Sequence, residues 1–255
     1  MHKKYFFFDI DGTLTYGEPG QRVPPESAKY AISKLQENGH FVAIATGRSY
    51  PGALDIMEEF GICNMISDGG NGITIDKKLL EVEPLDKEKC IALIEECKRK
   101  RIPWAISPEI TRSKWTDSEE FTRKSRYPEN EVIVIEDLDP RDYENIYKVY
   151  VAGKEEDLES LKALPHCRYN NRCFFVEPTQ KEIGIYKMME YLKAPLEDVV
   201  VFGDGLNDLS MFKDEWTCIA MADGAEELKD KADYVTDAPQ EDGVYKACKR
   251  FGWIE

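Results

Sequence analysis

Short apolar runs alternate with helical patterns in the first third of the chain. Residues 5–8 are four aromatic residues in succession, and residues 40–45 form a second, largely apolar run. Uninterrupted runs of this length are typical of strands buried on both faces of a parallel sheet. Between them, apolar residues recur at helical spacing until Gly39 ends the pattern. The alternation continues with a predicted helix at 51–60, a strand at 63–66 and a hairpin at 73–82.

The pattern changes near Glu83. Residues 87–100 have the spacing of an amphipathic helix, and residues 147–151 alternate like a strand with one face in water. The polar segment 109–127 has no clear pattern. We also expect a helix at 154–164 and strands at 104–106, 131–135 and 167–176, the last with a tight turn at Asn170-Asn171. This middle section is typical of an antiparallel α+β domain.

The strand–helix alternation resumes near residue 179. Thr179 to Glu182 fits a capping box, which predicts the start of a helix. Later elements are a buried strand at 199–202, a helix containing Met211, strands at 217–221 and 234–236, and a helix at 225–231. We therefore predict an α/β fold with a doubly wound, mostly parallel Rossmann-like core sheet. Residues 1–82 and 179–255 would form this core, and residues 83–178 an inserted α+β domain.

Composition limits the classes of protein to which the chain can belong. It has 255 residues, of which 42% are hydrophobic, and a net charge of −15. This charge disfavours nucleic acid and anionic membranes as partners, and no apolar run is long enough to span a bilayer. The seven cysteines form no C-x-x-C pair, which argues against a disulfide framework or a structural zinc site. Because the first residues lack a signal-peptide cleavage region, we expect a cytoplasmic protein.

Two carboxylates follow the first buried strand, at the edge where open parallel sheets bind ligands. Asp9 and Asp11 are two residues apart, so in extended chain they project to the same side. Like charges at that distance repel unless a proton or a cation lies between them, and Mg²⁺ prefers carboxylate oxygens. A strand followed by an acidic turn explains the same residues without a ligand, and this stretch by itself does not decide between the two.

Three further stretches follow a buried strand or open a helix. Thr46-Gly47-Arg48 combines a hydroxyl, a glycine amide and a predicted helix N-terminus, which suits a phosphate, although Thr46 could simply cap the helix. Lys181 lies in the first turn of a helix, where the macrodipole disfavours a cation. Solvent exposure is the ordinary explanation of such a lysine, and a phosphate shared with the helix end is the functional one. The stretch 203–208 has side-chain oxygens at Asp204, Asn207 and Asp208, more than a turn needs and suited to a metal.

Together, the four stretches resemble the motifs of the haloacid dehalogenase superfamily, and specifically its Cof-like phosphatases with a type IIB cap. Residues 9–13 are similar to the first motif, 46–48 to the second, Lys181 to the third and 203–208 to the fourth. The resemblance spans the whole chain: residues 237–244 are similar to the C-terminal segment, and the inserted domain stands where the subfamily has its cap. Residues 71–73 and 221–225 depart from the family pattern, which concerns the substrate pocket rather than the nucleophile.

The resemblance implies a hydrolase of phosphate monoesters that works through an aspartyl-phosphate. Asp9 would be the nucleophile, Asp11 the general acid and base, and Lys181 the catalytic cation. The implied Mg²⁺ ligands are Asp9, the backbone carbonyl of Asp11, Asp204 and Asp208. The implied contacts to phosphate and substrate are Gly12, Thr46, Gly47, Arg48, Asn71 and Asn207, with Asn207 orienting Lys181 or Asp208.

The expected substrate is a small phosphorylated metabolite, such as a sugar phosphate, and we expect a monomer or a homodimer. Candidates for selecting the leaving group are the cap residues Arg112, Lys114, Trp115, Arg168, Asn170 and Arg172, although surface Arg and Lys are usually just solvated. A sugar phosphomutase is an alternative within the same fold, because it would keep the phospho-aspartate and return the phosphoryl group to a second hydroxyl. A phospholigand-binding regulator without turnover predicts loss of the nucleophile or the lysine, and both are present.

Overall fold

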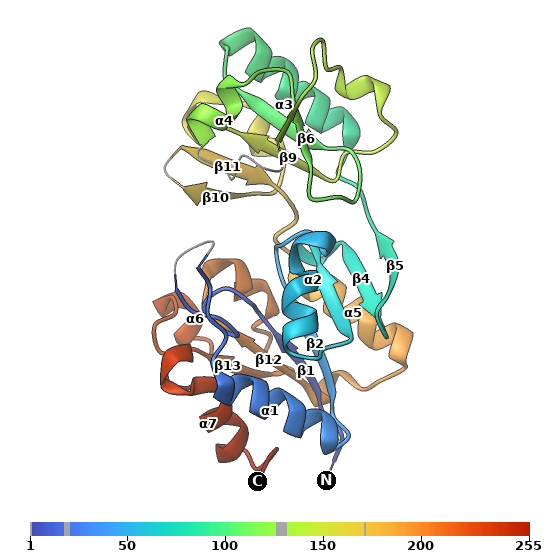
Figure 1. Cartoon of the computed structure of the whole chain (residues 1–255). Coiled ribbons are helices and arrows are strands. Elements are labelled where there is room, and N and C mark those ends of the chain that lie inside the picture. The colour runs from blue at the N-terminus through green and yellow to red at the C-terminus, as the bar shows by residue number, and fades with distance from the viewer. Residues whose placement is uncertain (1, 18–20, 126–131, 171) are drawn as a thin grey trace. The chain divides into compact units, whose positions relative to one another are not determined.

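The computed structural model describes residues 2–17, 21–125, 132–170 and 172–255. They divide into two compact units, one of residues 1–48, 53–81 and 180–255 and the other of residues 49–52 and 82–179 (Figure 1). The first unit is therefore discontinuous in sequence, and the second is formed almost entirely by one continuous stretch. The domain ranges 1–82, 83–178 and 179–255 stay our proposal for how the chain is organised.

The first unit is built on an eight-stranded sheet. The strands from β14 through β12, β1 and β2 to β3 pair in parallel, and β3 pairs antiparallel with β4. In sheet order the strands are β14 (Tyr234–Val235), β13 (Thr217–Ala220), β12 (Val199–Gly203), β1 (Tyr5–Phe8), β2 (Phe41–Ala45), β3 (Asn64–Ser67), β4 (Gly72–Ile75) and β5 (Lys78–Val82). This architecture confirms the predicted doubly wound α/β core.

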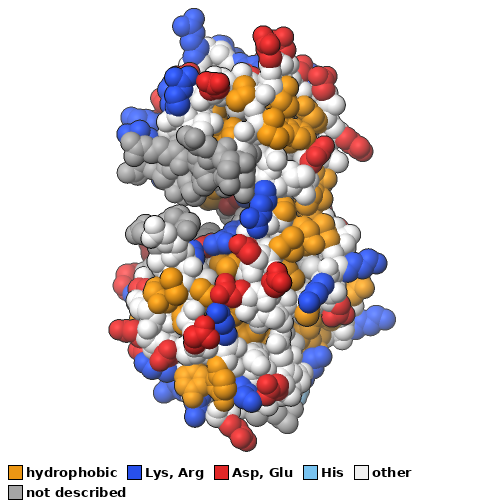
Figure 2. Space-filling view, viewed as in Figure 1, with side chains coloured by type: hydrophobic (Ala, Val, Ile, Leu, Met, Phe, Trp, Pro, Cys, Tyr) orange, Lys and Arg blue, Asp and Glu red, His pale blue; other side chains and the backbone are white. Residues whose placement is uncertain are grey.

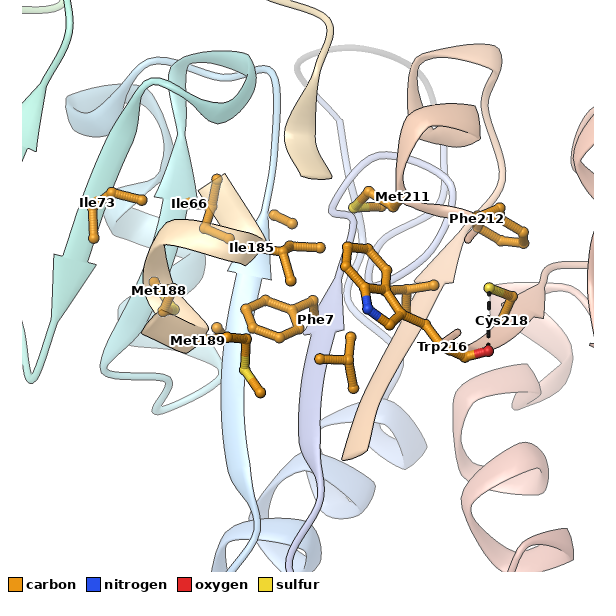
Figure 3. Packing of buried hydrophobic residues seen from close by; sticks show 14 of the residues in the cluster. Phe7, Ile66, Ile73, Ile185, Met188, Met189, Met211, Phe212, Trp216 and Cys218 are labelled. Atoms are coloured by element: carbon orange, nitrogen blue, oxygen red, sulfur yellow. Dashed lines mark hydrogen bonds between the residues drawn. The ribbon is translucent and has the colours of Figure 1, made fainter. Parts of the chain in front are cut away.

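Strand β1 is buried on both faces, as its four aromatic residues predicted. Phe7 points into a cluster with Ile185 and Met189 of α5 (Lys181–Leu192), as Figure 3 shows. Phe6 and Phe8 lie on the opposite face, where Phe6 packs edge-on against Trp253 and Phe8 stacks on the neighbouring strand. The other helices of this unit are α1 (Glu26–Glu37), α2 (Tyr50–Glu59), α6 (Glu226–Lys229) and α7 (Gly243–Arg250).

The second unit is a six-stranded sheet with a helix packed on each face. Helix α3 (Lys87–Lys100) buries Leu93 and Ile94 against the sheet, and Phe121 of α4 (Glu120–Ser125) packs with Tyr150 on the other face. In sheet order the strands are β10 (His166–Asn170), β11 (Cys173–Val176), β9 (Lys148–Val151), β6 (Trp104–Ser107), β7 (Lys114–Thr116) and β8 (Val132–Val134). The pairs are antiparallel except for β7 with β8.

Several local predictions were wrong. Strand β9 is buried along its whole length rather than wet on one face, because both faces of its sheet are covered. The predicted helix at 154–164 is two 3₁₀ turns, Glu155–Asp157 and Ser160–Ala163. Its buried residues Leu158, Leu161 and Leu164 recur every three residues, which is the 3₁₀ period. The turn predicted at Asn170-Asn171 lies partly outside the described residues.

The elements after residue 178 also differ from the prediction in three places. Helix α5 has Gln180 as its N-cap and no side-chain cap, so the predicted capping box is absent from the structure's described residues. The helix expected after Asp208 is a 3₁₀ helix, Leu206–Met211. Helix α7 was not predicted.

In the second unit, the polar segment 109–127, for which the sequence showed no clear pattern, contains β7 and α4.

Acidic and basic side chains are interspersed on the face of each unit that Figure 2 shows. Among the helices of the described ranges, none has the length and apolar character needed to cross a bilayer.

Candidate active site

The order of the strands brings distant carboxylates to one edge of the core sheet. Strands β1 and β12 pair in parallel, with Phe8 opposite Phe202, so the residues that follow them meet at their carboxyl ends. Asp9 follows β1, and Asp204 follows β12. The 3₁₀ helix after β12 adds Asp208, which is fully buried. Ligand atoms of these three carboxylates lie within 4.8 Å of one another.

Lys181 is the cation at the centre of this cluster. It is the first residue of α5, and its side chain is 1% exposed. Its Nζ donates hydrogen bonds to Asp9 Oδ1 at 2.6 Å, to Asp208 Oδ1 at 2.6 Å and to the Ala45 carbonyl at 3.0 Å. All three donors of the ammonium are thereby used. Burial alone would lower the pKa of Lys181, but the charges and hydrogen bonds of Asp208 and Asp9 raise it above its ordinary value.

Asp208 and Thr13 hold the loop that carries Asp204. The Oδ2 atom of Asp208 accepts hydrogen bonds from the amides of Asp204 and Gly205, at 3.0 and 2.9 Å. The Thr13 hydroxyl donates to Asp204 Oδ1 at 2.8 Å. Gly12 has φ +100°, and a Cβ on it would lie 2.2 Å from Asp204 Oδ2. Only glycine therefore fits between the first motif and this carboxylate.

The three carboxylates fit a hard divalent cation. Burial, and then repulsion by Asp208, raises the pKa of Asp9 to about 7, although Lys181 opposes the shift. Burial, and then repulsion by Asp9, raises the pKa of Asp204 to about 8. Buried carboxylates that repel one another need more positive charge than one lysine provides, and oxygen donors are what Mg²⁺ or a similar cation prefers. The cluster is therefore suited to a divalent metal.

The carboxylate of Asp11 lies apart from the cluster and is held by two arginines. Arg48 Nε donates to Asp11 Oδ2 at 2.8 Å, and Arg48 Nη2 to Asp11 Oδ1 at 2.6 Å. Arg22 Nε lies 3.1 Å from Asp11 Oδ1. The simple expectation that Asp9 and Asp11 turn their carboxylates to one point is therefore wrong for this structure, because Arg48 binds Asp11 in a fork and Lys181 binds Asp9.

The remaining core residues lie around the ends of β2 and β3. Thr46 is buried, and its hydroxyl accepts a hydrogen bond from the Arg48 amide at 3.1 Å. The hydroxyl therefore stabilises the turn through Gly47 rather than capping α2, which begins at Tyr50. The Thr46 carbonyl accepts from the Gly69 amide at 3.1 Å, which joins this turn to the loop that leads to Asn71.

The role of Asn207 in orienting Lys181 or Asp208 stays a prediction. Asn207 is exposed, and among the described residues the hydrogen-bond partners of Lys181 and Asp208 are other groups. The candidates from the inserted domain also differ in environment. Lys114 is buried and lies over the Tyr150 ring, whereas Arg168 is exposed and pairs with Glu155.

Two buried or partly buried cations were not singled out from the sequence. Arg22 stands in the loop after β1 with no motif around it, and Lys148 in β9 forms a buried ion pair with Glu177. A lysine within an otherwise apolar strand was a usable signal for Lys148. No sequence signal pointed to Arg22, because only the fold brings it to Asp11.

Comparisons with known proteins agree with this geometry. The protein named "Putative phosphatase YkrA" from Bacillus subtilis is 30% identical over 266 residues, which cover all of both chains. The 5-amino-6-(5-phospho-D-ribitylamino)uracil phosphatase YcsE from the same organism is 26% identical and covers 98% of this chain and 96% of its own. The solved structure of the HAD subclass IIB sugar phosphatase BT4131 has a TM-score of 0.79 and 26% identity, over 99% of this chain and 100% of that one.

A family profile matches nearly the whole chain. It is described as haloacid dehalogenase-like hydrolase and covers residues 6–248. This range includes both segments of the core and the inserted domain. The match and the relatives confirm the resemblance drawn from the four motifs and the enzyme class that it implied, a hydrolase of phosphoric monoesters. The chain belongs to the haloacid dehalogenase-like hydrolases.

Proposed function

We propose that the chain is a Mg²⁺-dependent phosphatase that hydrolyses small phosphometabolites through an aspartyl-phosphate on Asp9. The observation that carries the proposal is the buried contact of Lys181 with Asp9 and Asp208, at 2.6 Å to each. A purely structural ion pair needs one carboxylate for one lysine. Here Asp208 is a second carboxylate on the same lysine, and Asp204 adds further negative charge. A bound divalent cation would balance this charge, and the cation and Lys181 together would attract a phosphoryl group.

The first chemical step transfers the phosphoryl group to the enzyme. A carboxylate oxygen of Asp9 attacks phosphorus, and the bond from phosphorus to the ester oxygen breaks. That oxygen takes a proton from Asp11 and leaves as the alcohol. The hydrogen bond from Lys181 keeps Asp9 oriented, and its charge offsets the negative charge of the phosphoryl oxygens.

The second step returns the enzyme to its starting state. Water attacks phosphorus, gives a proton to Asp11 and forms phosphate as the bond to Asp9 breaks. Thr46, the Gly47 amide and Gly12 line the turns around Asp9, and we assign them to the non-reacting phosphoryl oxygens. Asp9, Asp204 and Asp208 would hold Mg²⁺, with the Asp11 carbonyl as a further ligand. When bound, Mg²⁺ supplies positive charge that draws phosphate dianions into the acidic site.

The names of the relatives support the substrate class that we propose. Relatives at 26% identity are named as a sugar phosphatase and as a phosphatase of a phosphorylated ribitylaminouracil. We therefore propose small phosphorylated sugars or similar esters, with residues 83–178 acting as the cap domain that chooses among them. Arg48 and Asn71 of the core are our candidates for contact with the leaving group.

The test is release of phosphate from a panel of phosphometabolites, with and without Mg²⁺. We expect turnover by the wild type that needs the metal and is lost in Asp9→Asn. Asp230→Asn is the matched control, because it removes a charge from an exposed aspartate at the end of α6, away from the cluster. Wild-type protein that binds Mg²⁺ but releases phosphate from no ester would rule out a phosphatase.

The same assay separates the alternatives. A mutase would show a product with the phosphoryl group on another hydroxyl, a requirement for a sugar bisphosphate and no net phosphate release. A regulator without turnover would bind phosphorylated ligands equally well in wild type and Asp9→Asn and release phosphate in neither.

A further inference from the structure

We propose that Arg22 and Arg48 form a second anion site, which binds a carboxylate or a second phosphate on the part of the substrate that leaves as the alcohol. This inference rests on the proposed function, because it describes the substrate of the same site. It adds a residue outside the sequence motifs, Arg22, and narrows the substrate class to esters with two anionic groups.

Two guanidinium groups converge on one carboxylate in the first unit. Arg48 forms a two-point fork with Asp11, and Arg22 approaches the same Oδ1 atom from the loop after β1. The backbone places Arg22 firmly, because its neighbour Val23 exchanges two hydrogen bonds with Tyr16, at 2.9 and 3.1 Å. Forks of planar guanidinium groups are suited to carboxylate and phosphate.

Arg22 has a hydrogen-bond donor that Asp11 does not satisfy. Its Nε–H is buried, and within the described parts of the chain it has no hydrogen-bond acceptor with acceptable geometry. The 3.1 Å approach to Asp11 Oδ1 is thus an ion pair without a well-aimed hydrogen bond. A buried donor left without an acceptor is unfavourable. An anion that entered between the two arginines would remove this penalty.

The charges around Asp11 also leave room for a further anion. Asp11 carries one negative charge, and Arg22 and Arg48 carry two positive charges. Asp55 and Asp9 also lie near Arg48, and their negative charges offset part of this positive charge. The side chains of Arg22 and Arg48 are 23% and 27% exposed, so a ligand can reach them.

Binding of the second anion would also change the partner of Asp11. In the structure both oxygens of Asp11 accept from Arg48. An acid that protonates the leaving oxygen must have an oxygen directed at the substrate. A substrate anion that takes over the guanidinium groups frees Asp11 for that task. Esters without the second anion would leave Asp11 bound to Arg48 and would be poorer substrates.

The experiment measures binding apart from turnover, in the Asp9→Asn background with Mg²⁺ present. Calorimetric titration compares 3-phosphoglycerate with glycerol 3-phosphate, which differ in a carboxylate, and fructose 1,6-bisphosphate with fructose 6-phosphate, which differ in a phosphate. We expect the member with the second anionic group, in at least one pair, to bind about tenfold to a hundredfold more tightly, since charge-assisted hydrogen bonds are of that strength. The pair with the larger ratio identifies which anion is preferred.

The second variant is Asp9→Asn with Arg22→Gln, in which the ratio should fall towards one. Asp9→Asn with Arg250→Gln is the matched control, because it removes an exposed arginine on α7. Ratios near one in both pairs, or a ratio that Arg22→Gln leaves unchanged, would overturn the inference. A preserved ratio in binding together with no phosphate release by the wild type would instead contradict the proposed function and leave the second anion site standing.

Discussion

Binding of Mg²⁺ should release protons from the acidic cluster, in an amount that depends steeply on pH. Metal ligands must be deprotonated, whereas the pKa of Asp9 is raised to about 7 and that of Asp204 to about 8 in the metal-free protein. At pH 6 both groups are therefore mostly protonated. Binding of one metal ion should therefore release about 1.9 protons at pH 6 and fewer than about 0.1 protons at pH 9.5.

Isothermal calorimetry in two buffers of different protonation enthalpy measures this number directly. The apparent binding enthalpy changes between the buffers in proportion to the protons released. Asp204→Asn is the informative variant, because it removes one titrating carboxylate and should reduce the release at pH 6 by about one proton. Mg²⁺ affinity should also rise with pH from about 6 to about 8 in the wild type and level off above that range.

The result that refutes the reasoning is a small and constant release. Fewer than about 0.3 protons at pH 6 would mean that the carboxylates are already ionised without metal. Burial and mutual repulsion would then be too weak to hold protons on them, and the electrostatic case for a cation site would fail. Release near two protons that persists at pH 9.5 would point to other groups as the source.

Three further outcomes can be checked independently. The raised pKa values of Asp9 and Asp204 favour their protonated forms in the folded state. Their contribution to the stability of the metal-free protein is therefore full below about pH 4 and is lost as pH rises through about 7 to 8. The gap in Tm between samples with Mg²⁺ and with EDTA should widen from pH 5 to pH 8.5, and a constant gap would contradict this. Gly12→Ala should weaken Mg²⁺ binding and lower the free energy of unfolding by at least about 1 kcal/mol, because the added Cβ meets Asp204. Gly39→Ala is the control: Gly39 has φ +83° and no atom within 4 Å of an added Cβ, so the variant should keep activity while bearing similar backbone strain. Equal losses of metal binding in the two variants would argue against the steric explanation. Cys63 and Cys167 are the two half-buried cysteines, but the Cys167 thiol donates a hydrogen bond to Glu177 Oε1 and its pKa is raised by burial. The other five cysteines are buried, so a thiol reagent at pH 8 should show one fast-reacting cysteine, and Cys63→Ser should abolish that phase.

Hydrophobic periodicity and short apolar runs predicted the core elements, because each core strand is short, apolar and bounded by polar turns. Strands β1, β2 and β12 and helix α3 lie close to their predicted ranges for this reason. The fold then placed Asp9, Asp204 and Lys181 together, as strand order at a parallel sheet's edge requires. Their roles in catalysis remain proposals that the experiments above address.

The parts that could not be predicted depend on contacts between distant segments. The wet face expected for β9 is covered by Phe121 of α4, an element without a periodic signal in the sequence. Asp11 and Arg22 are eleven positions apart in the sequence, but their contact depends on the tertiary fold of the loop after β1. Side-chain partners of this kind follow from tertiary structure and not from local propensity.

The discontinuous core has a consequence for synthesis of the protein on the ribosome. Strand β1 lies between β2 and β12 in the sheet, but β12 begins at Val199. At elongation rates of about 5–20 residues per second, β1 is made on the order of ten to forty seconds before β12 exists to pair with it. During that time one edge and the aromatic side chains of Tyr5 to Phe8 lack their final partners, which is the arrangement that promotes aggregation. We therefore expect the nascent chain to be open to aggregation, and to binding by chaperones, until residues 199–203 emerge and complete the sheet.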